Sequence, residues 1–332
     1  MLLRHLVHLL LVAAALPAQS ASQPTSAPAP RGTLVVLNKN DHDVSLIDAV
    51  SGETRKRIPV GMGPHEAVAA PDGKTVVVCN YGAQVPGQTL SILDVARQEL
   101  RGTIDLAPYR RPHGIQISND GRDVAVTAEM DQKLLIVDLA QQKVTRTVPT
   151  AARISHMVVQ TADAKRAYVA NIASGSVCVL DLGAGKHVKE IPTDKGCEGI
   201  ALRPGAPELW VTNRAADTLS VIDTDRLEVV AKLACGKFPL RIAFTPDGRH
   251  ALVACTNSNE IALFDAKERK ELRRIALEPG AAPAGILIPP DGTRAYVAQM
   301  QRNSLAEIET TTWRVLREIA TGNVPDGMAW VR

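Results

Sequence analysis

The stretch "CEGIALRPGAPELWVTNRAADTLSVIDTDRLEVVAKL", Cys197–Leu233, contains four short apolar runs separated by turn residues. The runs are "GIAL", "ELWVTN", "LSVID" and "EVVAKL", and Pro, Gly, Asp and Asn stand between them. Runs of this length bounded by turn residues predict β-strands, and none has the three-and-four spacing of apolar residues that is typical of a helix. The stretch therefore predicts one four-stranded antiparallel unit.

The third run of this unit recurs along the whole chain. Each copy ends in an acidic residue, and successive acids are 42 to 46 residues apart: Asp48, Asp94, Asp138, Asp181, Asp223, Asp265 and Glu309. A period in this range with several short β-type runs per unit is typical of propeller blades. The sequence therefore predicts seven blades.

The two ends of the repeat region complement each other. "TLVVLN" (Thr33–Asn38) has the pattern of the second strand of a blade. "PDGMAWV" (Pro325–Val331) has the pattern of a first strand, and the other three strands of a blade do not follow it. The last strand would complete the blade that the first one starts, which closes the ring and leaves no unpaired edge at the junction. We predict an all-β fold, a single seven-bladed β-propeller over residues 33–332.

The repeats also carry a family resemblance. The chain resembles the YVTN-type seven-bladed β-propeller repeat proteins in "PVGMGPHEAVAAPDGK" (Pro59–Lys74), "RAYVANIASGSVCVLDL" (Arg166–Leu182), "ELWVTNRAADTLSVIDT" (Glu208–Thr224) and "FTPDGR" (Phe244–Arg249). The resemblance covers nearly all of residues 33–332 and implies the same fold. It does not specify a function, because such propellers serve as binding, scaffold, electron-transfer-partner and enzyme domains.

The first 32 residues differ in composition from the repeats. Residues 1–21 contain one early arginine, an apolar run from Leu6 to Leu16 and then small residues, which predicts a signal peptide. Residues 22–32 are rich in Pro, Ala and Ser and are predicted to form a linker. The apolar run is too short to span a bilayer. We therefore expect a periplasmic or secreted protein without a transmembrane segment.

Composition excludes some partners. The net charge is +3, with acidic and basic residues spread evenly along the chain, so no basic tract is available for a phosphate backbone. The ten aromatic residues (3 Trp, 4 Tyr and 3 Phe) are too few for an evident base-stacking surface. Nucleic acid is therefore not an expected partner, and we expect a monomer.

Five cysteines would permit at most two disulfides in an oxidising compartment. Cys79, Cys178 and Cys255 lie within β-type runs, where cysteine usually packs as a small apolar residue. Cys197 and Cys235 lie at nearly equivalent points of successive repeats. The sequence leaves open whether these two cysteines form a disulfide or remain thiols.

One position of the repeat differs from the others in its chemistry. It is the head of each predicted inner strand, and its seven occupants in chain order are His65, His113, His156, Glu198, Leu240, Ala284 and Asp326. Inner strands line the central channel of a propeller, so these residues should meet around one end of the channel, which we call the mouth. Ring closure would make Asp326 a neighbour of His65.

Further polar residues are expected at the same mouth. In an up-and-down blade, the connection after the second strand lies at the same end as the head of the first strand. This places Lys39, Tyr81, Glu129 and Arg214 there, and Cys197 and Arg241 stand directly beside mouth positions in the sequence.

A His- and carboxylate-rich mouth predicts a metal site. Imidazole nitrogens and carboxylate oxygens are ordinary ligands of zinc, copper and iron, so we expect a divalent transition metal held by His65, His113, His156, Glu198 and Asp326. The alternative is that each imidazole is only hydrogen-bonded to a neighbouring loop. The sequence lacks the motif C-x-x-C-H, which predicts that no haem is covalently attached.

Three functions are compatible with this pattern. The first is an exported protein that binds a small molecule or a protein partner at the mouth, with a bound transition metal. The second is a lactonase-like hydrolase or lyase with His113, His156 and Glu198 as acid–base groups and Arg214 binding an anionic substrate. The third is a protein-interaction scaffold without a small-molecule site.

Overall fold

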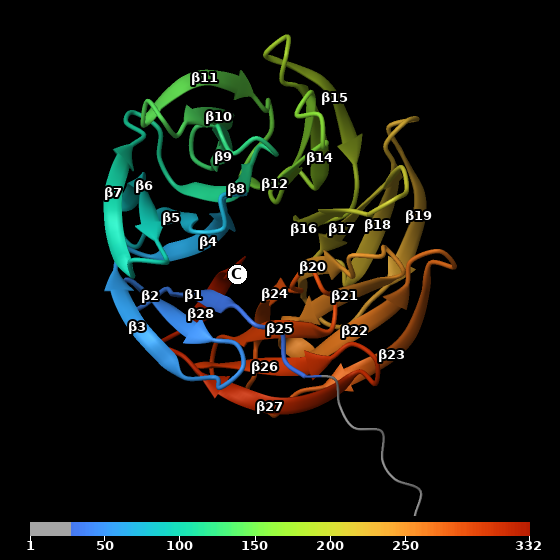
Figure 1. The fold of residues 1–332 in the computed structure, drawn as a ribbon. Helices are drawn as coiled ribbons and strands as arrows, with labels where there is room; N and C mark the ends of the chain where they lie inside the picture. Colours follow the sequence, from blue (N-terminus) through green and yellow to red (C-terminus); the bar gives the residue numbers. More distant parts are fainter. Residues whose placement is uncertain (1–27) are drawn as a thin grey trace, which may run out of the picture.

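The computed structural model describes residues 28–332 and contains seven four-stranded antiparallel sheets arranged in a ring (Figure 1). The predicted all-β, seven-bladed fold is confirmed. The predicted signal peptide, residues 1–21, and residues 22–27 of the predicted linker lie outside the described residues. The described part of the chain contains no helix long and apolar enough to cross a membrane.

Six blades are each built from four consecutive strands. The first three of these blades comprise β4 (Pro64–Ala69), β5 (Thr75–Gly82), β6 (Pro86–Asp94) and β7 (Glu99–Asp105), then β8 (Pro112–Ile117), β9 (Asp123–Ala128), β10 (Lys133–Asp138) and β11 (Lys143–Pro149), then β12 (Ser155–Gln160), β13 (Arg166–Asn171), β14 (Ser176–Asp181) and β15 (Lys186–Pro192).

The other three blades follow the same order. They comprise β16 (Cys197–Leu202), β17 (Glu208–Asn213), β18 (Thr218–Asp223) and β19 (Glu228–Ala234), then β20 (Pro239–Phe244), β21 (His250–Cys255), β22 (Glu260–Asp265) and β23 (Lys270–Ala276), then β24 (Pro283–Leu287), β25 (Arg294–Gln299), β26 (Ser304–Glu309) and β27 (Arg314–Ala320), with a short 3₁₀ turn at Thr256–Ser258.

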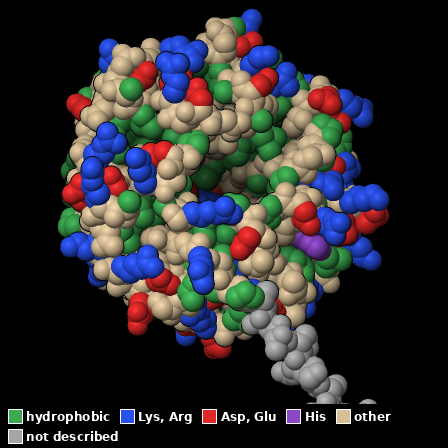
Figure 2. Space-filling model, viewed as in Figure 1, with side chains coloured by type: hydrophobic (Ala, Val, Ile, Leu, Met, Phe, Trp, Pro, Cys, Tyr) green, Lys and Arg blue, Asp and Glu red, His purple; other side chains and the backbone are tan. Residues whose placement is uncertain are grey.

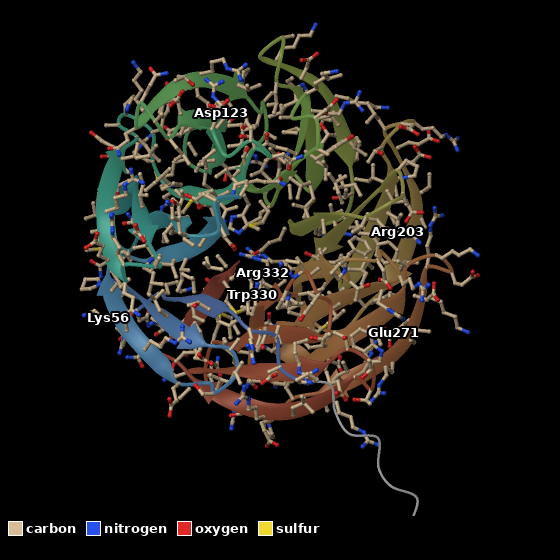
Figure 3. The ribbon with its side chains drawn as sticks, in the orientation of Figure 1. Lys56, Asp123, Arg203, Glu271, Trp330 and Arg332 are labelled. Carbon is tan, nitrogen blue, oxygen red and sulfur yellow. The ribbon has the colours of Figure 1, made fainter. Side chains whose placement is uncertain are left out.

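The seventh blade combines the two ends of the described chain. Its strand order is β28 (Pro325–Val331), β1 (Thr33–Asn38), β2 (Asp43–Asp48) and β3 (Thr54–Pro59). The C-terminus therefore lies at the centre of the ring, where Figure 3 places Trp330 and Arg332. The predicted ring closure is confirmed.

Blades are held together by apolar side chains on both of their faces. Leu34 of β1 packs in a cluster with Tyr296 of β25, whereas its neighbour Val35 packs in a cluster with Val76 of β5. Successive residues of a strand point to opposite faces of the sheet, so one strand contributes to both blade–blade interfaces. The outer strands are largely exposed and charged, as in "KELRRIA" of β23.

The Pro-Asp-Gly segments of the repeats form tight turns. The Asp72 side chain accepts hydrogen bonds from the backbone N–H groups of Lys74 at 3.0 Å and Thr75 at 2.8 Å, and Gly73 has a φ of 68°. These aspartates therefore stabilise tight turns.

Substitution of Leu34 by alanine should weaken the junction between the closing blade and the blade of β24–β27. Leu34 is 0% exposed, so loss of its side chain should lower the free energy of unfolding by about 2–5 kcal/mol. The measurement is chemical denaturation followed by circular dichroism. The matched control is Leu272→Ala on outer strand β23, because Leu272 is 49% exposed and should change stability by less than about 0.5 kcal/mol. Equal effects of the two substitutions would contradict this account of ring closure.

Candidate ligand site at the channel mouth

The inner strands contact one another around the channel in the order β28, β4, β8, β12, β16, β20 and β24. The predicted mouth residues His65, His113, His156 and Glu198 are second in β4, β8, β12 and β16 respectively. The structure therefore brings all four together, and Asp326 of β28 lies in the blade next to that of His65.

A β-bulge at the head of every inner strand adds further mouth residues. In β4, Pro64 pairs with Asn80 and Ala67 pairs with Val78, so the inner strand has one extra residue between these pairs. The pairing shifts at the same place in the other six blades. The bulge lets the residue after the predicted position contribute as well, and Glu66 is the functional candidate that the sequence pattern missed.

In four of the seven blades, the residue after the predicted mouth position is glycine. At two or more of these positions the structure requires glycine. A Cβ at Gly114 would lie 2.4 Å from the His156 carbonyl oxygen, and a Cβ at Gly327 would lie 2.3 Å from the His65 carbonyl oxygen. The glycines thus allow neighbouring inner strands to approach closely.

Four rings form a contiguous cluster at the mouth. The imidazoles of His113 and His156 are stacked, with their centroids 3.5 Å apart. The ring of His65 lies 5.2 Å from that of His113, and the Tyr81 ring lies 4.4 Å from His65 and 5.4 Å from His113. Arg111 packs on one side of the cluster, with its guanidinium 4.6 Å from the Tyr81 ring centre.

Both ring nitrogens of His156 face carboxylates. Nδ1 lies 2.9 Å from Oε2 of Glu129, and Nε2 lies 3.3 Å from Oε1 of Glu198. Burial alone would lower the pKa of His156, but the hydrogen bonds to these carboxylates outweigh burial and raise it. Burial likewise opposes ionisation of Glu198, yet His156 and two arginines hold the pKa of Glu198 at about 2. Carboxylates at both ring nitrogens therefore favour the imidazolium form of His156.

Arg241 joins this ion pair to the other side of the channel. Its Nη1 donates to Oε1 of Glu198 at 3.0 Å, and its Nη2 donates to Oε1 of Glu66 at 2.7 Å. Strands β20 and β4 belong to blades that are not adjacent, so the Arg241 side chain reaches across the channel. We call Glu66, Arg241, Glu198, His156 and Glu129 the mouth network.

The remaining predicted residues lie around this network. The Tyr81 hydroxyl donates to Glu129 at 2.8 Å, Lys39 forms an ion pair with Asp326 at 3.5 Å, and Arg214 forms an ion pair with Glu198. Cys197 is an exception: it packs in the apolar cluster that contains Tyr168 and does not join the network. The alternation of side chains along β16 explains this, because Glu198 points to the opposite side.

His65 differs from the other two histidines in its hydrogen bonding. Its Nδ1 lies 3.0 Å from the carbonyl oxygen of Gly63, so Nδ1 carries the proton and Nε2 keeps a lone pair. Burial lowers the pKa of His65 to about 4, which keeps the ring neutral at ordinary pH. His113 is completely buried, burial lowers its pKa well below the usual value, and its Nδ1 has no hydrogen-bond partner among the described residues.

A pocket of about 210 Å³ opens beside His65. Its lining includes Lys39, Tyr81 and Arg111 and the turn between β5 and β6. Figure 2 shows the opposite face of the ring, where Figure 3 places Arg332; this face has a central hollow with hydrophobic side chains on its wall.

The geometry does not support the predicted bare metal site. The described residues contain no group of three or more His, Cys, Asp or Glu side chains placed to hold a metal ion. The physical reason is that both nitrogens of His156 are engaged by Glu129 and Glu198, and His113 is stacked face to face on His156. Their lone pairs therefore cannot converge on one ion.

The structure contains no disulfide between Cys197 and Cys235, a pairing that the sequence leaves open. All five cysteines are free thiols, and the sulfur nearest to Cys235 is that of Cys255. Cys197 and Cys235 lie in different apolar clusters, because their equivalent positions in successive repeats are separated by a whole blade.

The fold and its polar channel mouth define a propeller with a candidate ligand site at one end, and comparison with known proteins identifies its family. The chain belongs to the cytochrome D1 heme domain family, whose model matches residues 115–288. The sevenfold propeller implied by the resemblance to YVTN-type proteins is confirmed, but the comparisons do not show that repeat family.

A curated relative is the dihydro-heme d1 dehydrogenase of Pseudomonas aeruginosa. It is 29% identical over 113 residues, which are 32% of this chain and 23% of that protein. The match therefore spans about a quarter of the relative's length.

Several solved structures have the same fold. They include hydrazine synthase of Kuenenia stuttgartiensis (TM-score 0.71, 17% identity, 80% of this chain and 89% of the other), a functionally unknown protein of Desulfotomaculum acetoxidans (0.76, 12%, 91% and 99%) and the dihydro-heme d1 dehydrogenase NirN in complex with DHE (0.67, 18%, 94% and 78%).

These relationships correct the predicted cofactor. The expectation of a zinc, copper or iron ion without covalent haem is contradicted, because the family is that of a haem domain and a curated relative is named a dihydro-heme d1 dehydrogenase. The missing C-x-x-C-H motif concerns only covalent attachment, so it carried no information about a haem held without thioether bonds. The relationships likewise favour a haem-related ligand over the lactonase-like alternative.

Acid should destabilise the protein partly through His65. The pKa of His65 is about 4 in the folded state and 6.5 in the unfolded state, so the unfolded state binds more protons between these values. Stability therefore falls as the pH falls through this window. Between pH 7 and pH 5, wild type should lose about 2 kcal/mol more than His65→Gln, measured by urea denaturation. Parallel losses in the two proteins would contradict a neutral, buried His65.

The pKa of His156 should depend on Glu129. Glu129→Gln removes one of the two carboxylates that favour the imidazolium, so the pKa of His156 should fall by at least one unit, or about 1.4 kcal/mol. NMR titration of the histidine ring protons measures this shift. Glu53→Gln, at an exposed position outside the mouth, is the control and should leave the titration unchanged.

Proposed function

We propose that this chain binds a haem-related tetrapyrrole at the channel mouth, with His65 as the imidazole that faces the iron. The observation that carries this proposal is the state of His65: its ring is neutral, its Nδ1 is fixed on Gly63, and its Nε2 is free beside a pocket. A hydrogen bond from the second ring nitrogen to a carbonyl oxygen is the usual support of a histidine that ligates a metal.

The other two histidines are less suited to this role. Both nitrogens of His156 contact carboxylates, which raise its pKa and leave neither nitrogen facing the pocket. His113 is stacked on it and is buried more deeply than His65. We infer that these two rings pack behind His65 and hold its ring in position.

The surrounding donors fit the rest of such a ligand. Tetrapyrroles carry carboxylate groups, which pair well with arginine and lysine. Arg111 and Lys39 line the pocket, and Arg214 is partly exposed near Glu198. Tyr81, whose ring packs against Arg111, also lines the pocket.

The size of the pocket limits how much of the ligand it receives. Complete pockets for organic ligands measure roughly 300–1,000 Å³, whereas this one measures about 210 Å³. We infer that the pocket receives part of the ligand and that the surrounding mouth loops contact the remainder.

When bound, such a group would supply an iron centre whose redox behaviour depends on the imidazole that ligates it and on the polarity around it. The residues of this chain orient that imidazole, exclude water from its Nδ1 side and hold buried charge nearby. The mouth network contributes the His156 ring, an arginine and three carboxylates, and it is connected to His65 through the ring of His113.

The predicted signal peptide and linker remain part of this proposal. We infer that residues 33–332 act as an exported single-domain propeller.

The test is an absorbance titration of the purified chain with ferric protoporphyrin haem and, separately, with haem d1. Wild type should bind one equivalent of at least one of them, and His65→Ala should bind about tenfold or more weakly. His250→Ala, which removes an imidazole packed against Trp313 outside the mouth, should bind like wild type.

Free imidazole should restore the absorbance band of His65→Gly, which separates loss of a ligand from loss of the fold. Absence of binding by wild type, or equal binding by His65→Ala, would overturn the proposal.

A further inference from the structure

Two cysteines outside the mouth network lie side by side. The sulfur atoms of Cys235 and Cys255 are 3.7 Å apart. Cys235 directly follows β19 in the connection to the next blade, and Cys255 is the last residue of β21 in that blade; the two strands lie in adjacent blades of Figure 1. A disulfide needs a separation of about 2.05 Å, so the two sulfurs, now in van der Waals contact, would have to approach by a further distance of about 1.7 Å.

The local backbone holds the two residues in this arrangement. The backbone N–H of Cys235 donates to the Asp217 carbonyl oxygen at 2.9 Å, and Cys255 is paired in the sheet with both Pro239 and Glu260. A Cβ at residue 236 would lie 2.7 Å from the Cys255 sulfur, so Gly236 leaves the space that the Cys255 sulfur occupies.

No other cysteine has this environment. Cys235 and Cys255 share one apolar cluster, whereas Cys79, Cys178 and Cys197 each belong to a different one. The geometry therefore singles out one pair of the ten that five cysteines allow.

We propose that Cys235 and Cys255 form a disulfide when the chain meets a disulfide-bearing oxidant. In this reaction the two thiols give two protons and two electrons to the oxidant. With glutathione disulfide, one S–S bond breaks, one S–S bond forms between Cys235 and Cys255, and two molecules of glutathione are released. A protein thiol oxidoreductase in its disulfide form would supply the same balance.

The two sulfurs differ in access, which sets the order of the exchange. In the folded protein Cys235 is 9% exposed and Cys255 is 0% exposed, so an oxidant would reach Cys235 first there. The hydrogen bond to Cys255 and burial raise the pKa of Cys235, which slows its attack in the folded protein. We therefore expect the bond to form during folding.

The bond would also support the mouth. Residues 235–238 lead into inner strand β20, and the guanidinium of Arg214 lies 5.3 Å from the Phe238 ring centre. Arg214 in turn contacts Glu198 of the mouth network. A disulfide would fix the connection on which Arg214 rests.

The test is thiol counting after the full chain is refolded in a glutathione redox buffer. The protein is denatured, alkylated without reductant and weighed intact; we expect three alkylated cysteines out of five. Tryptic digestion should yield peptide 233–237 linked to peptide 250–267, and reduction should separate them.

Three single variants complete the test. Cys235→Ser and Cys255→Ser should each show four alkylated cysteines, whereas Cys197→Ser, a buried cysteine of another cluster, should keep the linked peptides. Reduction of wild type should lower its melting temperature by several degrees, and it should not change that of Cys235→Ser. Five alkylated cysteines in refolded wild type, or a link that includes peptide 196–214 with Cys197, would overturn the proposal.

Discussion

Pairing of β1 with β28 is the constraint on which the rest of the structure depends. It joins residues about three hundred positions apart, and without it the closing blade would lack its inner strand. Because a ring of blades fixes each inner strand between two neighbours, closure also determines where the head of every inner strand lies. Side chains that are 43 to 48 residues apart in sequence, such as His65, His113 and His156, become neighbours in space only for this reason.

Charge burial then determines how the mouth is arranged. Buried carboxylates and cations are costly unless each has a partner. At this mouth Glu198 has His156, Arg214 and Arg241, and Glu66 has Arg241. Because of these pairings, two of the predicted metal ligands, His156 and Glu198, are not available to a metal. His65 is then the neutral imidazole that lines the pocket. The same balance of burial and pairing lowers the pKa of His65 and raises that of His156, although the two residues occupy equivalent positions in the repeat.

The fold could be predicted almost completely from the sequence, because the period of the acidic strand ends and the unequal chain ends are local patterns. The meeting of the mouth residues followed from the fold. Its chemistry did not follow, because the β-bulge that lets Glu66 contribute is a feature of strand pairing and leaves no residue motif. The sequence could not predict either that Cys255 is the cysteine nearest to Cys235. Alternation of side chains along β21 and the space left by Gly236 determine this. The haem relationship came from similarity to known proteins, since a haem held without covalent bonds needs no short motif.

Arg241 gives the propeller two chemically separate ends. Its side chain crosses the channel and joins Glu198 to Glu66 between the two ends. The mouth side carries the histidines and the partly exposed arginines, and the opposite side carries the tight Pro-Asp-Gly turns and the C-terminal Arg332. A protein that docks on the turn side could therefore hold the propeller in place without competing with whatever occupies the mouth.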